Sequence, residues 1–140
     1  MSVYFDASVI VSMLIEDAWS ARADAFIVKE RPDPIVSDFT RAEVASAIAA
    51  KLRRLEIDLD LARVALARFD QWRRDVATDC ELTASDIATA EAFLRRLDLP
   101  LKAPDALQLA LASRLGVSIA TFGAQLATSS HTLGVAVAPT

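Results

Sequence analysis

Short apolar runs alternate with longer segments of helical periodicity along this chain. Residues 3–5 are bulky and β-prone without alternation, which predicts a short buried strand, and residues 35–36 predict a second one. Helices are expected over residues 8–15 and 20–28, and the proline-rich segment 31–34 is expected to be a break. Strands that alternate with helices predict an α/β fold with a parallel sheet covered on both faces.

The middle of the chain predicts a helical hairpin. Ser37 or Asp38 can cap a helix that continues to about residue 55. Its apolar stripe is formed by Val44, Ile48, Leu52 and Leu55. A second helix is expected after Asp58, and the short turn between the two should place them side by side. The apolar side of this second helix is formed by Leu61, Val64, Ala65, Leu66, Phe69 and Trp72.

The last part of the chain repeats the alternation. A brief strand within residues 79–83 and a helix over 85–97 come first. A helix then begins at residues 103–104 and ends near 114, because proline suits a first helical turn and Gly116 suits a helix end. The remaining expected elements are a strand at 117–121, a short helix near Ala124 and a final strand at 135–137.

Length and composition limit the class of protein. At 140 residues we expect a single domain over residues 1–140. The apolar fraction of 54% exceeds the usual ~45–50%, so we expect part of the surface to be covered by a homodimer, a partner chain or both. The first residues lack the pattern of a secretory signal, and Cys80 has no second cysteine to pair with. A cytoplasmic protein is expected.

The net charge of −4 counts against a dedicated nucleic-acid binder, which usually has a basic excess. It does not exclude a nuclease, because a group of metal-binding acids lowers the net charge by itself. The chain also lacks a glycine-rich phosphate loop, which excludes nucleotide binding of the P-loop or dinucleotide type.

Three acids lie in unusually apolar surroundings. Asp6 closes the first strand, Glu43 lies in a helix rich in Ala, Val, Ile and Leu, and Asp105 opens an apolar helix. A carboxylate in such a setting is penalised by desolvation unless a cation meets it. Three of them, far apart in sequence, indicate one shared partner, for which a divalent metal ion is the natural candidate.

The expected topology brings these acids toward one edge of the sheet. In a doubly wound α/β fold, ligands bind at the carboxyl ends of the strands. Asp6 and Thr121 end strands, and Glu43 lies on a helix that follows a strand. Each acid also has a structural explanation: Asp6 can accept backbone N–H groups, Glu43 can be a solvated helix residue, and Asp105 can favour a helix start.

Four segments in this order resemble the PIN-domain nucleases and, among them, the VapC-like toxins. They are Tyr4-Phe5-Asp6-Ala7-Ser8, Arg41-Ala42-Glu43-Val44, residues 104–110 and residues 117–122. The resemblance covers essentially the whole chain. It implies a three-layer α/β/α fold with a short, mainly parallel central sheet.

The resemblance further implies an endoribonuclease that cuts RNA with Mg²⁺ or Mn²⁺ and acts as the toxin of a toxin–antitoxin pair. Asp6, Glu43 and Asp105 would bind the metal, and hard oxygen ligands suit Mg²⁺. Thr121 would join them as a catalytic residue, and Ser8 and Thr121 would orient the acids or the attacking water. The implied partner is an antitoxin protein, whose tail enters the site; the homodimer is expected from the apolar fraction alone.

One position departs from the family pattern. Members usually have a fourth acid two residues after the position of Thr121, and here that place is Gly123. Glycine offers no ligand, so we expect one well-held metal ion rather than two. The same departure supports an alternative hypothesis, in which the protein is a weakly active or inactive module that binds RNA or an antitoxin.

Other residues attract attention without supporting a site. His131, the only histidine, is expected in a surface loop after the last helix, and Cys80 is expected to be a small buried residue. Lys102 could meet a phosphate but is expected to be solvated. Asp6 with Ser8 also invites comparison with aspartyl phosphatases, which carry a second acid where this chain has Ser8.

Overall fold

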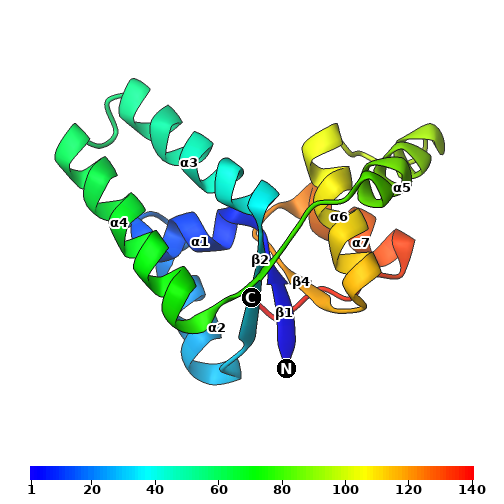
Figure 1. Ribbon diagram of the computed structural model, residues 1–140, viewed down its shortest axis with the longest axis horizontal. Helices are drawn as coiled ribbons and strands as arrows, with labels where there is room; N and C mark the ends of the chain where they lie inside the picture. The colour runs from blue at the N-terminus through cyan, green and yellow to red at the C-terminus, as the bar shows by residue number, and fades with distance from the viewer.

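A computed structural model describes residues 1–140 and shows a four-stranded sheet between two groups of helices (Figure 1). The strands are β1 (Ser2–Phe5), β2 (Asp33–Ser37), β3 (Thr78–Cys80) and β4 (Ser118–Ala120), and their order in the sheet is β3-β2-β1-β4. Every pairing is parallel, with Tyr4 of β1 opposite Ile35 on one side and Ile119 on the other. The prediction of a short, mainly parallel sheet is confirmed.

The helices form a layer on each face of this sheet. One layer contains α1 (Ala7–Leu14), α2 (Ser20–Glu30), α3 (Asp38–Arg53) and α4 (Leu59–Val76). The other contains α5 (Ala84–Arg95), α6 (Ala103–Leu115) and α7 (Ala124–Leu133). In Figure 1 the hairpin of α3 and α4 lies on one side of β1 and β2, and α5 to α7 lie on the other. The predicted three-layer α/β/α arrangement with a helical hairpin is confirmed.

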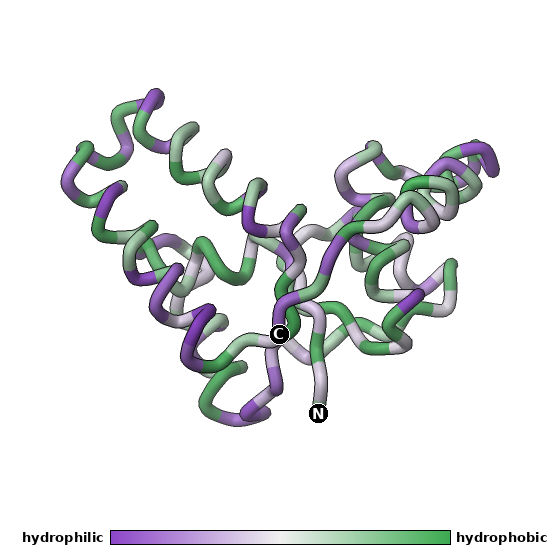
Figure 2. Tube along the Cα trace, viewed as in Figure 1, coloured by the Kyte–Doolittle hydropathy of each residue, from purple (hydrophilic) through white to green (hydrophobic).

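Alternation along β1 builds a separate core under each layer. Val3 and Phe5 pack into the cluster shared by α1 to α4, whereas Tyr4 faces the cluster formed with α6, β4 and α7. The Phe5 ring lies 5.9 Å from the rings of both Phe26 and Trp72. Figure 2 shows hydrophilic residues along α4 and at the outer end of α5, away from these cores. None of the helices combines the length and the hydropathy needed to cross a membrane.

The predicted helix ends are formed by local chemistry. The Ser37 side chain caps α3 by accepting a hydrogen bond from the Thr40 N–H, and Asp58 caps α4 in the same way through Leu61. Gly116 ends α6 with φ of +66°, a left-handed conformation that glycine adopts without strain. After this helix end the chain enters β4, which pairs with β1 from Ser118 onward.

Two predicted strand boundaries are wrong. The expected break includes Asp33 and Pro34, which belong to β2. Proline fits there because β3 pairs with β2 only from Ile35 onward, so the missing N–H of Pro34 faces no partner strand. The expected strand at 135–137 is reduced to a single bridge between Ile119 and Val137.

Three predictions about helix surfaces are also wrong. Leu55 is 89% exposed, because the chain leaves α3 and adopts φ of +59° at this residue. Leu61 and Val64 lie on the exposed side of α4, although their spacing fits an apolar stripe. His131 lies on α7 rather than in a loop, since α7 continues to Leu133, and its side chain is exposed as expected.

Candidate functional site

The candidate site lies where β1 and β4 end and α1 begins. Asp6 directly follows β1, and its backbone N–H donates to the Ala120 carbonyl over 3.0 Å, which continues the pairing with β4. The Asp6 residue is only 8% exposed. The turn from strand into helix therefore holds this carboxylate at the edge of the sheet, close to the end of β4.

Two hydroxyl groups hold the Asp6 carboxylate. The Ser8 Oγ donates to Asp6 Oδ2 over 2.6 Å, and the Thr121 Oγ1 donates to the same oxygen over 2.9 Å. Such charge-assisted bonds are stronger than neutral ones and fix the orientation of the carboxylate. The predicted relationship of Ser8 and Thr121 to the first acid is thus visible as direct contact.

The same hydroxyls also fix the loop after β4. The backbone N–H of Phe122 donates to Ser8 Oγ over 3.1 Å, and the N–H of Gly123 donates to Thr121 Oγ1 over 3.0 Å. Each hydroxyl therefore donates a hydrogen bond to Asp6 and accepts one from a backbone N–H. The acid and the loop over residues 121–123 form one connected unit.

Glu43 lies in the second turn of α3 and is half-buried. Its Oε2 accepts a hydrogen bond of 2.9 Å from Nε2 of Gln108, a fully buried residue of α6. The Gln108 amide oxygen in turn accepts hydrogen bonds from the hydroxyl of Tyr4 and from Oγ1 of Thr40. Those two donors leave the amide nitrogen of Gln108 facing Glu43.

This buried network was not predicted from the sequence. The Tyr4 hydroxyl also lies 2.7 Å from Ser37 Oγ and 2.9 Å from Thr40 Oγ1. Burial raises the pKa of the Tyr4 hydroxyl, so it stays protonated and available as a donor. The available sequence signal was a glutamine within the apolar run after Asp105, since a buried amide requires partners.

The three predicted acids lie in one electrostatic neighbourhood. Burial raises the pKa of Glu43; the Gln108 hydrogen bond opposes this, and the charges of Asp6 and Asp105 add to it. Burial likewise raises the pKa of Asp105, with a further increase from Asp6 and a smaller opposing effect of Lys102. Carboxylates whose pKa is raised by neighbouring carboxylates in this way are expected to attract a cation.

The carboxylates do not form a finished metal cage. The structure contains no group of three or more His, Cys, Asp or Glu side chains arranged to hold a metal ion. Asp6 and Glu43 line one cavity of about 610 Å³ together with Ser8 and Gly123, whereas Asp105 lies outside its lining. The donor set fits Mg²⁺ or Mn²⁺ bound through one or two carboxylates and water, which is the usual mode for Mg²⁺ in proteins.

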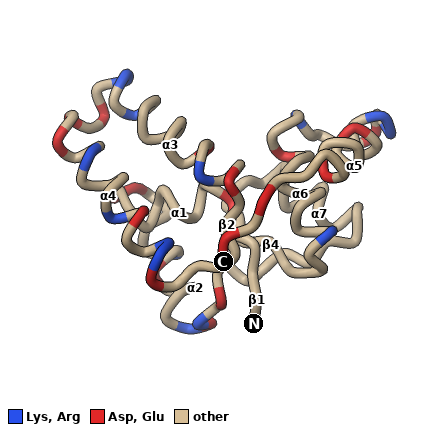
Figure 3. The backbone as a smooth tube through the Cα atoms, viewed as in Figure 1, with Lys and Arg blue, Asp and Glu red and all other residues tan.

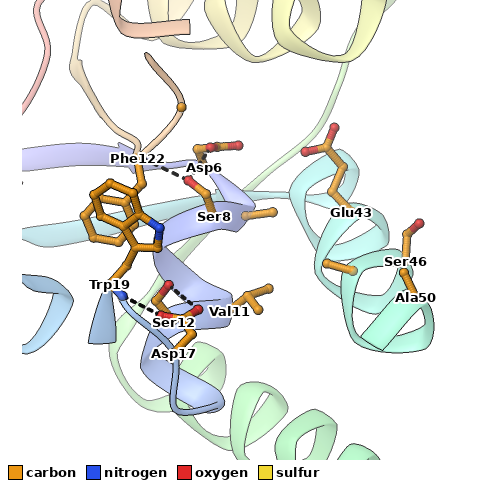
Figure 4. Close-up of a pocket in the computed structure, with 13 residues that line it drawn as sticks. Asp6, Ser8, Val11, Ser12, Asp17, Trp19, Glu43, Ser46, Ala50 and Phe122 are labelled. Carbon is orange, nitrogen blue, oxygen red and sulfur yellow. Dashed lines mark hydrogen bonds between the residues drawn. The ribbon is translucent and has the colours of Figure 1, made fainter. Parts of the chain in front are cut away.

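The far end of this cavity is aromatic. Trp19, from the loop after α1, and Phe122, from the loop after β4, line it beside the acids (Figure 4). Figure 4 also shows Glu43 and Ser46 across the cavity on α3. Neither ring was predicted to belong to the site; the available sequence signal was a tryptophan close to the acidic pair Glu16 and Asp17.

The remaining residues that the sequence analysis examined lie outside this cavity. Cys80 is half-buried, and burial raises the pKa of its thiol to about 11, so it is a poor nucleophile at neutral pH. Lys102 is exposed beside α6. Figure 3 shows acidic positions along the segment between α4 and α5, while Lys and Arg are scattered over several helices.

Comparison with known proteins gives one family and several similar folds. The family model of the PIN domain matches residues 3–129. No curated protein matches the chain by sequence. The fold is similar to VapC20 of Mycobacterium tuberculosis, described as a toxin that cleaves the sarcin–ricin loop, with a TM-score of 0.73 and 20% identity over 91% of this chain and 95% of that chain.

Two further structures have the same fold. FitAcB from Neisseria gonorrhoeae has a TM-score of 0.69 and 21% identity, and the match covers 96% of this chain and 95% of that chain. FitAB bound to a DNA fragment named IR36 has a TM-score of 0.73 and 20% identity over 96% of this chain and 92% of that chain. At these identities the similarity shows a common fold.

Proposed function

Because the chain belongs to the PIN domain family, we propose that it is a metal-dependent endoribonuclease and the toxin of a toxin–antitoxin pair. The observation that supports this most directly is the electrostatic coupling of acids from separate elements: the charges of Asp6 and Asp105 raise the pKa of Glu43, and that of Asp6 raises the pKa of Asp105. A structural role for each acid alone would not require this coupling.

In this proposal Asp6, Glu43 and Asp105 hold Mg²⁺, for which Mn²⁺ can substitute. The bound ion would supply Lewis-acid stabilisation of a phosphate oxygen and lower the pKa of water. Ser8 and Thr121 keep Asp6 Oδ2 occupied, so Oδ1 is the oxygen left for a ligand. Gln108 holds Glu43 and lowers its pKa, which keeps more of this carboxylate ionised.

The proposed substrate is an RNA phosphodiester. The description of VapC20 as a toxin that cleaves the sarcin–ricin loop supports RNA as the substrate class, because that protein has the same fold. A cognate antitoxin protein is the proposed partner, and the proposed place of action is the cytoplasm, where RNA and antitoxin are made. Exposed apolar side chains on α4, among them Leu61 and Val64, support a homodimer.

Gly123 supports a second candidate function. It lines the cavity beside Asp6 but offers no carboxylate, so the metal would be held by fewer ligands than the family pattern provides. A protein with this site could bind RNA or an antitoxin without cleaving RNA.

A cleavage experiment separates the two functions. Purified protein is incubated with structured RNA in Mn²⁺, beside the same reaction in excess EDTA and beside the variants Asp6→Asn and Gly123→Asp. Cleavage by the unchanged protein that needs Mn²⁺ and disappears in Asp6→Asn supports the enzyme. Cleavage that appears only in Gly123→Asp supports the binding module.

A further inference from the structure

Two aromatic rings stack at the end of the cavity opposite α3. The rings of Trp19 and Phe122 lie 5.2 Å apart at an angle of 20°, and Trp19 is 43% exposed. Both rings line the cavity that contains Asp6 and Glu43. Two neighbouring aromatic rings beside a candidate active site provide an apolar surface that a flat ligand could cover.

The loop that carries Trp19 is held in place by a polar network. Asp17 Oδ1 accepts from the backbone N–H of Trp19 over 2.8 Å, and Asp17 Oδ2 accepts from Ser12 Oγ over 2.9 Å. The buried Ser20 Oγ donates to the Ser12 carbonyl over 2.7 Å. The Trp19 backbone is therefore fixed to α1 at one side and to the start of α2 at the other, before any ligand binds.

The second ring is connected to the acids. The Phe122 N–H donates to Ser8 Oγ, and that hydroxyl donates to Asp6 Oδ2. Only these two hydrogen bonds separate the aromatic pair from the first metal-binding acid. A ligand whose phosphate lies at Asp6 would thus place its adjoining atoms against the two rings (Figure 4).

A cation accompanies the rings. The Arg22 guanidinium lies 5.1 Å from the centre of the Trp19 ring and 5.4 Å from that of Phe122. Arg22 donates to the main-chain oxygen of Thr140 over 2.6 Å, and no Asp or Glu side chain forms a salt bridge with it. Its charge favours an anionic ligand at this end of the cavity and disfavours a basic peptide segment.

We propose that Trp19 and Phe122 form a stacking platform for one base of single-stranded RNA, next to the phosphate that is cleaved, while Arg22 meets a flanking phosphate. A nucleotide combines a flat ring with a negative charge, which matches this pair of rings beside the Arg22 guanidinium. Single-stranded RNA is favoured because its bases can leave their neighbours and stack on aromatic side chains. This inference rests on the proposed function for the phosphate at Asp6.

Tryptophan fluorescence tests the platform without any cleavage. The chain has two tryptophans, and Trp72 packs against Phe5 and Phe69 in the core, so a Trp72→Phe variant reports Trp19 alone. This variant is titrated in Ca²⁺, which carboxylates also bind, with a short single-stranded RNA and, separately, with an abasic ribose-phosphate strand of equal length. A gel of the RNA after the titration shows that it is uncut. We expect the RNA to quench Trp19 and the abasic strand to leave it nearly unchanged.

Substitution of the ring completes the test. In the chain that retains Trp72, Trp19→Leu should weaken binding of the RNA roughly 5- to 100-fold, and Trp19→Phe should retain most of it, because stacking depends on the ring. Melting temperatures of both variants show whether they fold. Equal RNA affinity of folded Trp19→Leu and unchanged protein, or equal quenching by the abasic strand, would overturn the platform even if the protein cleaves RNA. If Trp19 stacks on RNA but the protein does not cleave RNA in Mn²⁺, the stacking platform is supported and the proposed nuclease activity is rejected.

Discussion

Nε2 of Gln108 donates a hydrogen bond to Oε2 of Glu43 over 2.9 Å, across 65 residues of sequence. Gln108 lies one helical turn after Asp105 on α6, so a single helix provides one predicted acid and the donor that holds another. Because Tyr4 and Thr40 occupy the amide oxygen, Gln108 has a fixed orientation. The site is thus organised by a buried network as well as by its acids.

Loss of this donor should change both stability and pH dependence. Gln108→Leu leaves the buried Tyr4 hydroxyl without one acceptor, which should cost about 1–3 kcal/mol of unfolding free energy. It also removes the interaction that lowers the pKa of Glu43, so the acid side of the pH–activity profile should move to higher pH. Gln125→Leu, at an exposed position on α7, is the matched control for a change of the same size. If the acid side of the pH–activity profile of Gln108→Leu matches that of the unchanged protein, the ionisation of Glu43 does not control activity.

The raised pKa of Glu43 predicts the sign of a stability change with pH. The native protein keeps a proton on Glu43 at pH values where the unfolded chain has released it, starting near the ordinary value of 4.5. The unfolded state then binds fewer protons, so this contribution to stability is complete below the ordinary pKa and is lost as pH rises through the folded pKa. In EDTA, Glu43→Gln should therefore melt higher than the unchanged protein at neutral pH, and the difference should shrink as the pH is lowered.

Asp86 should behave in the opposite way and is an internal control. Burial works against its ionisation, but bonds from Arg114 and Thr83 outweigh this and hold the pKa of Asp86 below its ordinary value. Its contribution is present above the unfolded pKa and is lost as pH falls through the folded one. Asp86→Asn should lower the unfolding free energy at neutral pH by about 1–3 kcal/mol, with a smaller loss in acid. If both variants melted higher than the unchanged protein at neutral pH, or both melted lower, the assignment of these charges would be contradicted.

A fourth acid can be added at Gly123 if the Thr121 hydroxyl shifts by about a few tenths of an ångström. A Cβ there would lie 3.3 Å from Thr121 Oγ1 and 3.5 Å from Leu126 Cβ, and the φ of −74° suits any residue. Gly123→Asp and Gly123→Asn can both cap α7, but only Asp adds a carboxylate to the cavity. We expect Asp to increase Mn²⁺-dependent cleavage and Asn to leave it unchanged or lower, with similar melting temperatures in EDTA. Equal cleavage by the two variants would show that the charge at this position is irrelevant.

Much of the fold could be predicted because local chemistry determines it. Val3 to Phe5 have no polar alternation, Ser37 and Asp58 are good caps, and Gly116 can end a helix, so the order of elements followed from the chain. The predictions failed where contacts with distant segments of the chain determine the local structure. Pro34 is accepted in a strand because the neighbouring strand starts one residue later, and no local pattern shows this.

The candidate site was predictable only in part. Asp6 and Glu43 do line one cavity, as the carboxyl-edge rule implied, but Asp105 affects Glu43 through its charge from outside the lining of that cavity. The roles of Gln108 and Trp19 depend on which helices and loops face each other across the sheet. That information is set by tertiary packing between distant segments, so neither residue could be assigned from its neighbours in sequence.

Direct titration of metal-free protein with Mn²⁺ in a calorimeter tests most directly whether the three acids share a cation. The account predicts one Mn²⁺ bound per chain, with at least ~10-fold weaker binding in each of Asp6→Asn, Glu43→Gln and Asp105→Asn. Asp98→Asn, which changes an exposed acid paired with Arg96, should bind like the unchanged protein. Equal affinity in all four variants, or no heat of binding for the unchanged protein with or without RNA, would contradict it.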